Sequence, residues 1–300
     1  MLDFSDPEFW NVPEVREATA AWISAALAED GADRDVTSQT LLGDQDRLAT
    51  ATITAGMPGI LCGASPAYEV FRRLDPRAEV DSIPADGRSV GTGEEVLVVR
   101  AHPVPLLAAE RTALNIFGSL SGIATQTGRW VALAGRTAVL DTRKTFPGAR
   151  LFQRRAVAAG GGTNHRYNLA DFPLVKENHR SLFGNGGPDD IGEITRRLQE
   201  AVPGVPVQIE VEDEESFRAA LAAGAERILI DNQSPATMAR WIENAEADGL
   251  QVRREDLEAS GGITGETIAD YAASGVGRVS LGALTHTWKS FDFSLHVEWA

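Results

Sequence analysis

Residues 206–232, PVQIEVEDEESFRAALAAGAERILIDN, contain two short apolar runs separated by a helical segment. The runs at 206–211 and 227–230 predict strands, and 214–223 predicts a helix between them. Two strands joined in this way pack side by side in parallel, because a parallel pair needs a crossover connection of about this length. The stretch therefore predicts a βαβ unit and an α/β fold.

The same pattern continues in both directions from this unit. Short apolar runs recur roughly every 20 to 30 residues, and helical segments lie between several of them. We expect further strands at 138–140, 172–175, 257–259 and 278–281, and further helices at 236–247 and 264–273. This spacing is typical of a parallel sheet or an α/β barrel.

The first part of the chain has a different texture. Residues 14–29 predict an amphipathic helix, 47–54 an alternating strand and 65–74 a second helix. Residues 85–102 form turns and a strand punctuated by glycines, and 104–119 predict a long helix. We expect a small α+β domain here, with the change to repeated strand–helix units near residue 120.

Composition excludes several classes of protein. The 300 residues are 43% hydrophobic and 24% charged, as in ordinary globular chains, and no stretch approaches the roughly 18 apolar residues of a membrane span. The net charge of −15 disfavours nucleic acid and anionic membranes as partners. Cys62 is the single cysteine, which excludes an internal disulfide framework and a multi-cysteine zinc site. Because no secretory signal pattern is present either, we expect a reducing, cytoplasmic location.

One stretch of this acidic chain is basic. Between Arg143 and Arg180 there are eight lysines and arginines but only two acids, Asp171 and Glu177. Two of the three lysines of the chain lie there, and lysine offers a compact point charge on a flexible stem. We therefore expect a focused site for a small polyanion. The basic residues are Arg143, Lys144, Arg150, Arg154, Arg155, Arg166, Lys176 and Arg180.

Polar residues directly follow each predicted strand of the second part. The C-terminal strand ends of an α/β barrel open onto one mouth, so we expect these residues to face one another. Glu210 and Asp231 are the acids expected there, ionised among basic groups and able to hold Mg²⁺, bind sugar hydroxyls or stabilise a cation. Glu212 is interpreted as a solvated strand end. The strand-end residues are Asp141–Lys144, Lys176–His179, Glu210–Glu212, Asp231–Asn232, Ser260–Gly262 and Gly282.

Glycine turns in the same part predict contacts with phosphate. Ser260–Gly262 precede a helix predicted to begin at Thr264, so backbone N–H groups and the positive helix end can meet an anion there. Residues 280–283 form a second such turn, and Gly160–Gly162 precede His165 and Arg166.

The signatures HExxH, GxSxG and GxGxxG are absent, so zinc-protease, serine-hydrolase and dinucleotide-binding chemistry find no support.

Several of these segments together resemble one family. Residues 141–179, DTRKTFPGARLFQRRAVAAGGGTNHRYNLADFPLVKENH, are similar to the signature of the quinolinate phosphoribosyltransferases. So are 109–125, 208–213, 228–232, 258–263 and 280–286, in the same order. The resemblance implies an N-terminal α/β sandwich domain over 1–120, completed by 288–300, and an incomplete, TIM-like α/β barrel over 121–287. It also implies a homodimer.

The resemblance further implies a reaction and the residues that serve it. Phosphoribosyl would pass from phosphoribosyl pyrophosphate (PRPP) to quinolinate with decarboxylation, giving nicotinate mononucleotide, pyrophosphate and CO₂ in NAD biosynthesis, with Mg²⁺ as cofactor. By matching positions, Lys144, Lys176, Glu210 and Asp231 would be catalytic, and the two acids would also hold Mg²⁺ bound to PRPP. Arg111 would reach the site from the partner subunit. The remaining substrate-binding positions are Thr142, Arg143, His165, Arg166, Ser260, Gly261, Gly262, Leu281, Gly282 and Ala283, and the two lysines also bind substrate.

Two other interpretations stay open on the sequence. One is a related phosphoribosyltransferase with a different pyridine or azole acid as acceptor, because Phe146 and the pair Arg154-Arg155 depart from the residues usual in the family. The other is a non-catalytic binding protein on the same scaffold. Glu210 and Asp231 argue against the second interpretation, because simple binding of a metabolite does not require acids on the metal side.

Overall fold

The computed structural model describes residues 2–300, which form two compact units. The first unit contains the residues up to Gly128 together with Phe146–Gly161 and Thr287–Ala300. The second contains Arg129–Thr145 and Gly162–His286. No helix within residues 2–300 is long and apolar enough to cross a membrane.

The first unit is built on a four-stranded antiparallel sheet in the order β12-β1-β5-β3. Its strands are β1 (Ala49–Ala55), β3 (Glu79–Val80), β5 (Glu95–Ala101) and β12 (Phe293–Trp299), and a separate ladder joins β2 (Gly59–Ile60) to β4 (Ser89–Val90). Side chains of β1 alternate between buried and half-buried positions, as its sequence predicts. The C-terminal residues of the chain thus form an edge strand of the first unit.

Five helices of the chain begin in the first unit, and α3 packs on β5 of the sheet. They are α1 (Pro13–Asp30), α2 (Val36–Leu42), α3 (Ala64–Leu74), α4 (Pro103–Ala134) and α5 (Arg150–Ala159), with short 3₁₀ turns at Phe9–Asn11 and Ala32–Arg34. Phe117 of α4 stacks on Phe293 of β12 with 4.2 Å between ring centroids. Gly122 lets the chain cross α4 closely, because a Cβ there would lie 2.2 Å from the carbonyl oxygen of Lys289. The helix expected at 104–119 continues to Ala134, so the change of domain expected near residue 120 falls inside α4.

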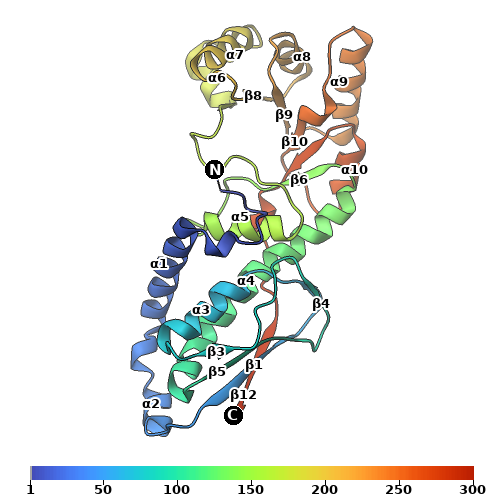
Figure 1. The fold of residues 1–300 in the computed structure, drawn as a ribbon. Coiled ribbons are helices and arrows are strands. Elements are labelled where there is room, and N and C mark those ends of the chain that lie inside the picture. Colours follow the sequence, from blue (N-terminus) through green and yellow to red (C-terminus); the bar gives the residue numbers. More distant parts are fainter. Residues whose placement is uncertain (1) are drawn as a thin grey trace. The chain divides into compact units, whose positions relative to one another are not determined.

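The second unit is a six-stranded parallel sheet flanked by helices, as the alternating sequence pattern predicts. Its strands run in the order β6-β11-β10-β9-β8-β7, and Figure 1 shows α7, α8 and α9 flanking β8, β9 and β10. The strands are β6 (Ala138–Leu140), β7 (Leu174–Val175), β8 (Gln208–Val211), β9 (Arg227–Asp231), β10 (Leu257–Ser260) and β11 (Arg278–Ser280). The helices are α6 (Glu177–Phe183), α7 (Asp189–Ala201), α8 (Glu214–Ala222), α9 (Pro235–Ala247), α10 (Ile268–Ala273) and α11 (Ala283–His286), with a 3₁₀ turn at Arg254–Asp256.

The sheet order is that of an α/β barrel with one opening. The first and last strands, β6 and β11, are neighbours, whereas the consecutive strands β6 and β7 are not paired. The helix between β6 and β7 is α5, which belongs to the first unit. Instead, Thr163 forms a single parallel bridge to Leu140, and its N–H donates to the carbonyl of Val139 at 2.8 Å. This bridge sets the path of the residues that follow, among them His165 and Arg166.

One predicted helix begins later than expected. The sequence pattern predicts a helix over 264–273, but α10 begins at Ile268. The carbonyl of Thr264 accepts the N–H groups of both Thr267 and Ile268, at 3.2 and 2.9 Å, so a turn precedes the helix. The positive end of α10 therefore does not directly follow Gly262, and the loop from Ser260 must offer its own backbone groups to a ligand.

Candidate active site

The carboxyl ends of the barrel strands enclose a cavity of about 360 Å³. Its lining includes eight of the residues proposed from the sequence, contributed by the ends of β6, β7, β9 and β10 and by the loop after Thr163. These are Thr142, Arg143, Lys144, His165, Arg166, Lys176, Asp231 and Ser260. Leu174, Leu229, Glu258 and Ser280 complete the lining, and of these only Ser280 had a predicted role, in the glycine turn at 280–283.

The turn after β6 holds two exposed cations at this cavity. The side chain of Thr142 accepts the backbone N–H of Lys144 at 3.1 Å, and the hydroxyl of Thr285 donates to the Lys144 carbonyl at 2.7 Å. Arg143 and Lys144 are both exposed, and neither forms an ion pair within the described part of the chain. Because two such cations repel each other, the turn favours an anionic ligand.

The loop after Thr163 is tied down by a buried acid. Asp141 has no exposed surface, and its carboxylate accepts the backbone N–H of His165 at 2.7 Å and the side-chain amide of Asn164 at 2.8 Å. Arg166, the next residue, donates from Nη1 to the carbonyl of Phe172 at 3.2 Å. Burial, with the nearby positive charge of Arg143, lowers the pKa of Arg166 below its ordinary value. The guanidinium remains charged at neutral pH. An anion bound at this wall of the cavity would therefore be attracted by a positive charge.

The glycine loop after β10 packs tightly against the end of β9. Gly261 and Gly262 have φ angles of +92° and +63°, which disfavour any residue with a side chain. A Cβ on Gly261 would lie 2.1 Å from Oδ1 and 2.8 Å from the backbone nitrogen of Asn232. Asn232 itself has a φ of 54° and donates its N–H to the Ser260 carbonyl at 2.9 Å. The two strand ends thus form one rigid turn beside Asp231.

The second glycine turn lies beside Lys144. Gly282 accepts the N–H groups of Thr285 and His286 at 3.0 and 3.2 Å and so begins the short α11. A Cβ on Gly282 would meet Lys144 Cδ at 2.8 Å and His286 Nε2 at 2.9 Å. Leu281, Gly282 and Ala283 do not line the cavity themselves, but Ser280 directly before them does.

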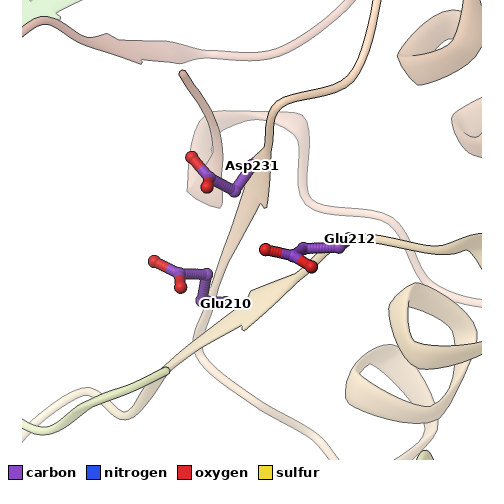
Figure 2. A group of neighbouring side chains, drawn as sticks. All are labelled: Glu210, Glu212 and Asp231. Carbon is purple, nitrogen blue, oxygen red and sulfur yellow. The ribbon is translucent and has the colours of Figure 1, made fainter. Parts of the chain in front are cut away.

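Three acids gather at the ends of β8 and β9 (Figure 2). One carboxylate oxygen from each of Glu210, Glu212 and Asp231 lies within 4.8 Å of the other two. Glu210 is buried and forms an ion pair with Lys176 of the cavity. Partial burial, with the negative charges of Glu177, Asp231 and Glu210, raises the pKa of Glu212. The negative charges of the acidic group therefore repel one another. Carboxylate oxygens at this spacing fit a hard divalent cation such as Mg²⁺.

Glu212 is exposed directly after β8, as expected of a solvated strand end, and the structure also brings it into the acidic group. It follows β8 two residues after Glu210, and alternate residues along an extended chain point to the same side. That spacing was visible in the sequence. His179, by contrast, has a local role, because its Nδ1 accepts the backbone N–H of Lys176 at the start of α6.

Arg111 is in the first unit and does not line the cavity. It lies on α4 with 66% of its side chain exposed, and its Nη2 is 3.7 Å from the carboxylate of the adjacent Glu110. The guanidinium is therefore held only weakly by its own chain.

Of the residues that left a different acceptor open, Arg154 and Arg155 are packed inside the first unit, whereas Phe146 is exposed. Arg155 is buried and donates from Nε to Asp86 at 2.7 Å and from Nη1 to the carbonyls of Phe4 and Asp6 at 2.6 and 3.0 Å. Arg154 is buried, with its guanidinium 5.0 Å from the ring centroid of Phe4. These contacts give the pair a structural explanation, so it no longer favours another acceptor.

Comparisons with known proteins point to one family along nearly the whole chain. The family sequence models "Quinolinate phosphoribosyl transferase, N-terminal domain" and "C-terminal domain" match residues 35–121 and 123–296. The probable nicotinate-nucleotide pyrophosphorylase (carboxylating) of Bacillus subtilis is 37% identical over 272 residues, which are 90% of each chain. The corresponding Mycobacterium leprae protein is 36% identical over 291 residues, covering 94% of this chain and 98% of the relative.

The fold gives the same result. The solved structure of the nicotinate-nucleotide pyrophosphorylase from Francisella tularensis superposes with a TM-score of 0.84 at 33% identity. It covers 94% of this chain and 96% of that one. The fold is therefore that of a known enzyme, and the chain belongs to the quinolinate phosphoribosyltransferase family.

Proposed function

We propose that this chain transfers phosphoribosyl from PRPP to quinolinate with loss of CO₂, forming nicotinate mononucleotide and pyrophosphate. The activity is the one carried in the names of its relatives, nicotinate-nucleotide pyrophosphorylase (carboxylating). The observation that carries the proposal is the pairing, at one barrel mouth, of exposed cations with a cluster of three acids. Such a mouth can hold an anionic acceptor beside a metal-bound pyrophosphate donor.

The cations are suited to the acceptor. Quinolinate carries two adjacent carboxylates, and Arg143, Lys144 and Arg166 line one cavity, where Arg143 and Lys144 form no ion pair within residues 2–300. Arginine forks bind carboxylates with two parallel hydrogen bonds. Binding of a dianion would relieve the repulsion between Arg143 and Arg166, which would make its affinity sensitive to salt.

The donor is held by the glycine turns and the acids. The loops Ser260–Gly262 and Leu281–Ala283 offer backbone N–H groups to phosphate oxygens. Glu210 and Asp231, joined by Glu212, would hold Mg²⁺, which supplies charge neutralisation for the departing pyrophosphate. Glu210 and Asp231 would also lie beside the ribose, where a carboxylate stabilises positive charge at C1.

The reaction needs no covalent nucleophile. The pyridine nitrogen forms a bond to C1 of the ribose as the bond from C1 to the pyrophosphate oxygen breaks. The ring then carries a positive nitrogen, which stabilises the electron pair left on the adjacent ring carbon when its carboxylate departs as CO₂. The ring carbon takes up one proton to give the product. Lys144 and Lys176 are the ammonium groups placed at the cavity to balance these charges.

A homodimer is part of the proposal. Arg111 is exposed and only weakly paired, so it can supply a further cation to the cavity of a partner subunit. Co-expression tests this: Arg111→Ala and Lys144→Ala chains, each inactive alone, should regain about a quarter of wild-type activity when mixed dimers form, because such dimers contain one intact site.

We also propose a reducing, cytoplasmic location, which the buried free thiol of Cys62 supports.

Turnover is the direct test of the reaction. The purified chain is incubated with quinolinate, PRPP and Mg²⁺, and CO₂ and nicotinate mononucleotide are followed together. Both should appear in equal amounts, and replacing quinolinate by nicotinate should give no CO₂. Lys144→Ala should lower kcat/KM by roughly 100-fold or more, whereas Lys289→Ala, which removes an exposed lysine of the first unit, should not. Binding of PRPP without either product would refute quinolinate as the acceptor.

A further inference from the structure

Glu258 is a buried acid on the inner side of the barrel that no step above uses. It lies in β10, only 1% of its surface is exposed, and it lines the cavity. Within residues 2–300 no lysine or arginine forms an ion pair with it. Its partners are Gln208 of β8, whose side-chain amide donates to Oε2 at 3.0 Å, and His165, whose Nε2 lies 3.3 Å from the same oxygen. An ionised carboxylate buried in this way needs such donors.

The imidazole of His165 is contacted at both nitrogens. Its Nδ1 accepts the backbone N–H of Arg166 at 2.8 Å, so Nδ1 carries no proton in this arrangement. The ring proton must then lie on Nε2, where it points to the Glu258 carboxylate. A doubly protonated ring would place two N–H groups against each other at Nδ1. The ring therefore acts as a neutral bridge between Glu258 and the backbone of Arg166.

This bridge complements the one made by Asp141. The Asp141 carboxylate accepts the backbone N–H of His165. Glu258 contacts the same residue at its imidazole ring. Asp141 directly follows β6 and Glu258 lies in β10, and β11 separates these two strands in the sheet. Arg166 follows directly and presents its guanidinium to the cavity. Its position therefore depends on acids from two different strands.

We propose that Glu258 is a positioning residue for the anion site: it fixes the orientation and tautomer of His165 and, through that ring, the placement of Arg166. The part of the proposal that concerns substrate rests on the proposed function, but the state of the ring does not. Burial acts to raise the pKa of Glu258, but its contacts with His165 and Gln208 hold it below its ordinary value. Arg227 of β9 adds a positive charge on the same side, so the acid is ionised at neutral pH and ready to accept.

The first test reads the ring directly and needs neither turnover nor a variant of Glu258. The chain contains five histidines, and ¹⁵N-labelled histidine with a His165→Gln variant for assignment identifies the signals of His165. The expected spectrum at pH 7 shows a neutral ring with the proton on Nε2. A proton on Nδ1, or a doubly protonated ring, overturns the proposal whatever the reaction proves to be.

The second test removes the acceptor while keeping the volume. Glu258→Met should change the tautomer signals of His165 and raise KM for quinolinate by about tenfold, the effect of losing one hydrogen bond to a charged group. KM for PRPP should change much less. Glu258→Gln keeps one acceptor oxygen and should restore most of the quinolinate affinity.

Glu226 provides the matched control. Its carboxylate accepts the N–H of Val207 at 2.9 Å and the side-chain amide of Gln199 at 2.8 Å, in the same unit but outside the cavity lining. Glu226→Met should lower the melting temperature without moving either KM. Equal effects of Glu258→Met on both KM values, with the His165 signals unchanged, would show that Glu258 serves stability alone. Absence of turnover in the wild type would instead count against the proposed function.

Discussion

The glycine loop after β10 gives the sharpest test of how the fold makes the donor site. Gly261 and Gly262 are adjacent and both have positive φ angles, +92° and +63°. A side chain at Gly261 would run into Asn232, whereas one at Gly262 would have no atom within 4 Å. Replacing each in turn by alanine separates the strain of the backbone from the collision with the neighbouring strand end.

The structure sets the size of the two effects. The positive φ alone costs about 1–2 kcal/mol for alanine at either position. At Gly261 the new Cβ would lie 2.8 Å from the backbone nitrogen of Asn232, and a backbone atom cannot turn aside as a flexible side chain can. Overpacking of this kind costs a further 1–3 kcal/mol or so. We expect Gly261→Ala to lose about 2–5 kcal/mol of the free energy of unfolding and Gly262→Ala about 1–2 kcal/mol.

Function should follow the displacement of the loop. The collision at Gly261 must move either the loop or Asn232, which follows the acid Asp231. A shift of about 1 Å in a positioned group lowers activity by roughly 100-fold, so kcat/KM for PRPP should fall by about 10- to 100-fold in Gly261→Ala. Gly262→Ala should lose clearly less. Gly224→Ala supplies the control, since Gly224 also has a positive φ and open space but precedes β9, at the opposite end of that strand from Asp231.

Urea unfolding and initial rates at varied PRPP provide the measurements. The expected order of stability is wild type, then Gly224→Ala and Gly262→Ala together, then Gly261→Ala. If Gly261→Ala matched Gly262→Ala in both stability and kinetics, the close contact with Asn232 would have no energetic meaning. The idea that two strand ends form one rigid phosphate turn would then be refuted.

Three further predictions concern ion pairs and acids elsewhere in the chain. Arg155→Met should lose about 3–5 kcal/mol in urea unfolding, because it leaves Asp86 buried without its cation; a loss under about 1 kcal/mol would contradict this. Asp75 accepts the backbone N–H and the ring of His102; burial acts to raise its pKa, but these bonds hold it below the ordinary 3.8. The stability that ionised Asp75 gives the fold is therefore present above about pH 4. It is lost as the pH falls through the lowered pKa that Asp75 has in the folded chain. The stability gap between wild type and Asp75→Asn, about 1–3 kcal/mol at pH 7, should close in acid, and a gap that stayed constant to pH 3 would oppose the assignment. Glu212→Gln should raise the Mg²⁺ concentration for half-maximal activity about fivefold, as loss of one carboxylate ligand implies, and an unchanged Mg²⁺ curve would remove Glu212 from the metal site.

The barrel could be predicted because its strands carry two signals at once. Runs such as 206–211 and 227–230 are apolar enough to be buried on both faces, and chemical residues follow them immediately. Parallel strands must then place those residues at one edge. The cavity lining, with Lys144 and Asp231 on it, follows from this rule alone.

The short helices could not be predicted in the same way. In α7 the outward face consists of charged residues such as Glu193 and Arg196, and only a narrow apolar stripe around Ile191 and Ile194 faces inward. Helices of this kind are stabilised mainly by packing on their neighbours. The late start of α10 has the same origin, since the turn at Thr264 depends on how the glycine loop meets the end of β9.

The basic stretch shows why charge alone could not assign the site. Counting residues treats Arg143 to Arg180 as one group, yet burial divides it. Arg143 and Lys144 are exposed at the cavity, while Arg155 is paired with Asp86 inside the first unit. Arg180 is buried and donates to the Gly186 carbonyl and the Ser216 hydroxyl at 2.7 and 3.0 Å.

This division follows from the path of the chain. Because α5 belongs to the first unit, the arginines on that helix leave the barrel although their sequence neighbours on both sides remain in it. An arginine that finds a carboxylate or carbonyls in the interior has its charge offset there and adds little to the field at the mouth. An arginine at a strand end that forms no ion pair, such as Arg143, can attract an anionic ligand with its full charge. The anion site is therefore made by cations that the packing leaves at the cavity, such as Arg143 and Lys144, and Glu258 matters in our proposal because it positions Arg166 on the same lining.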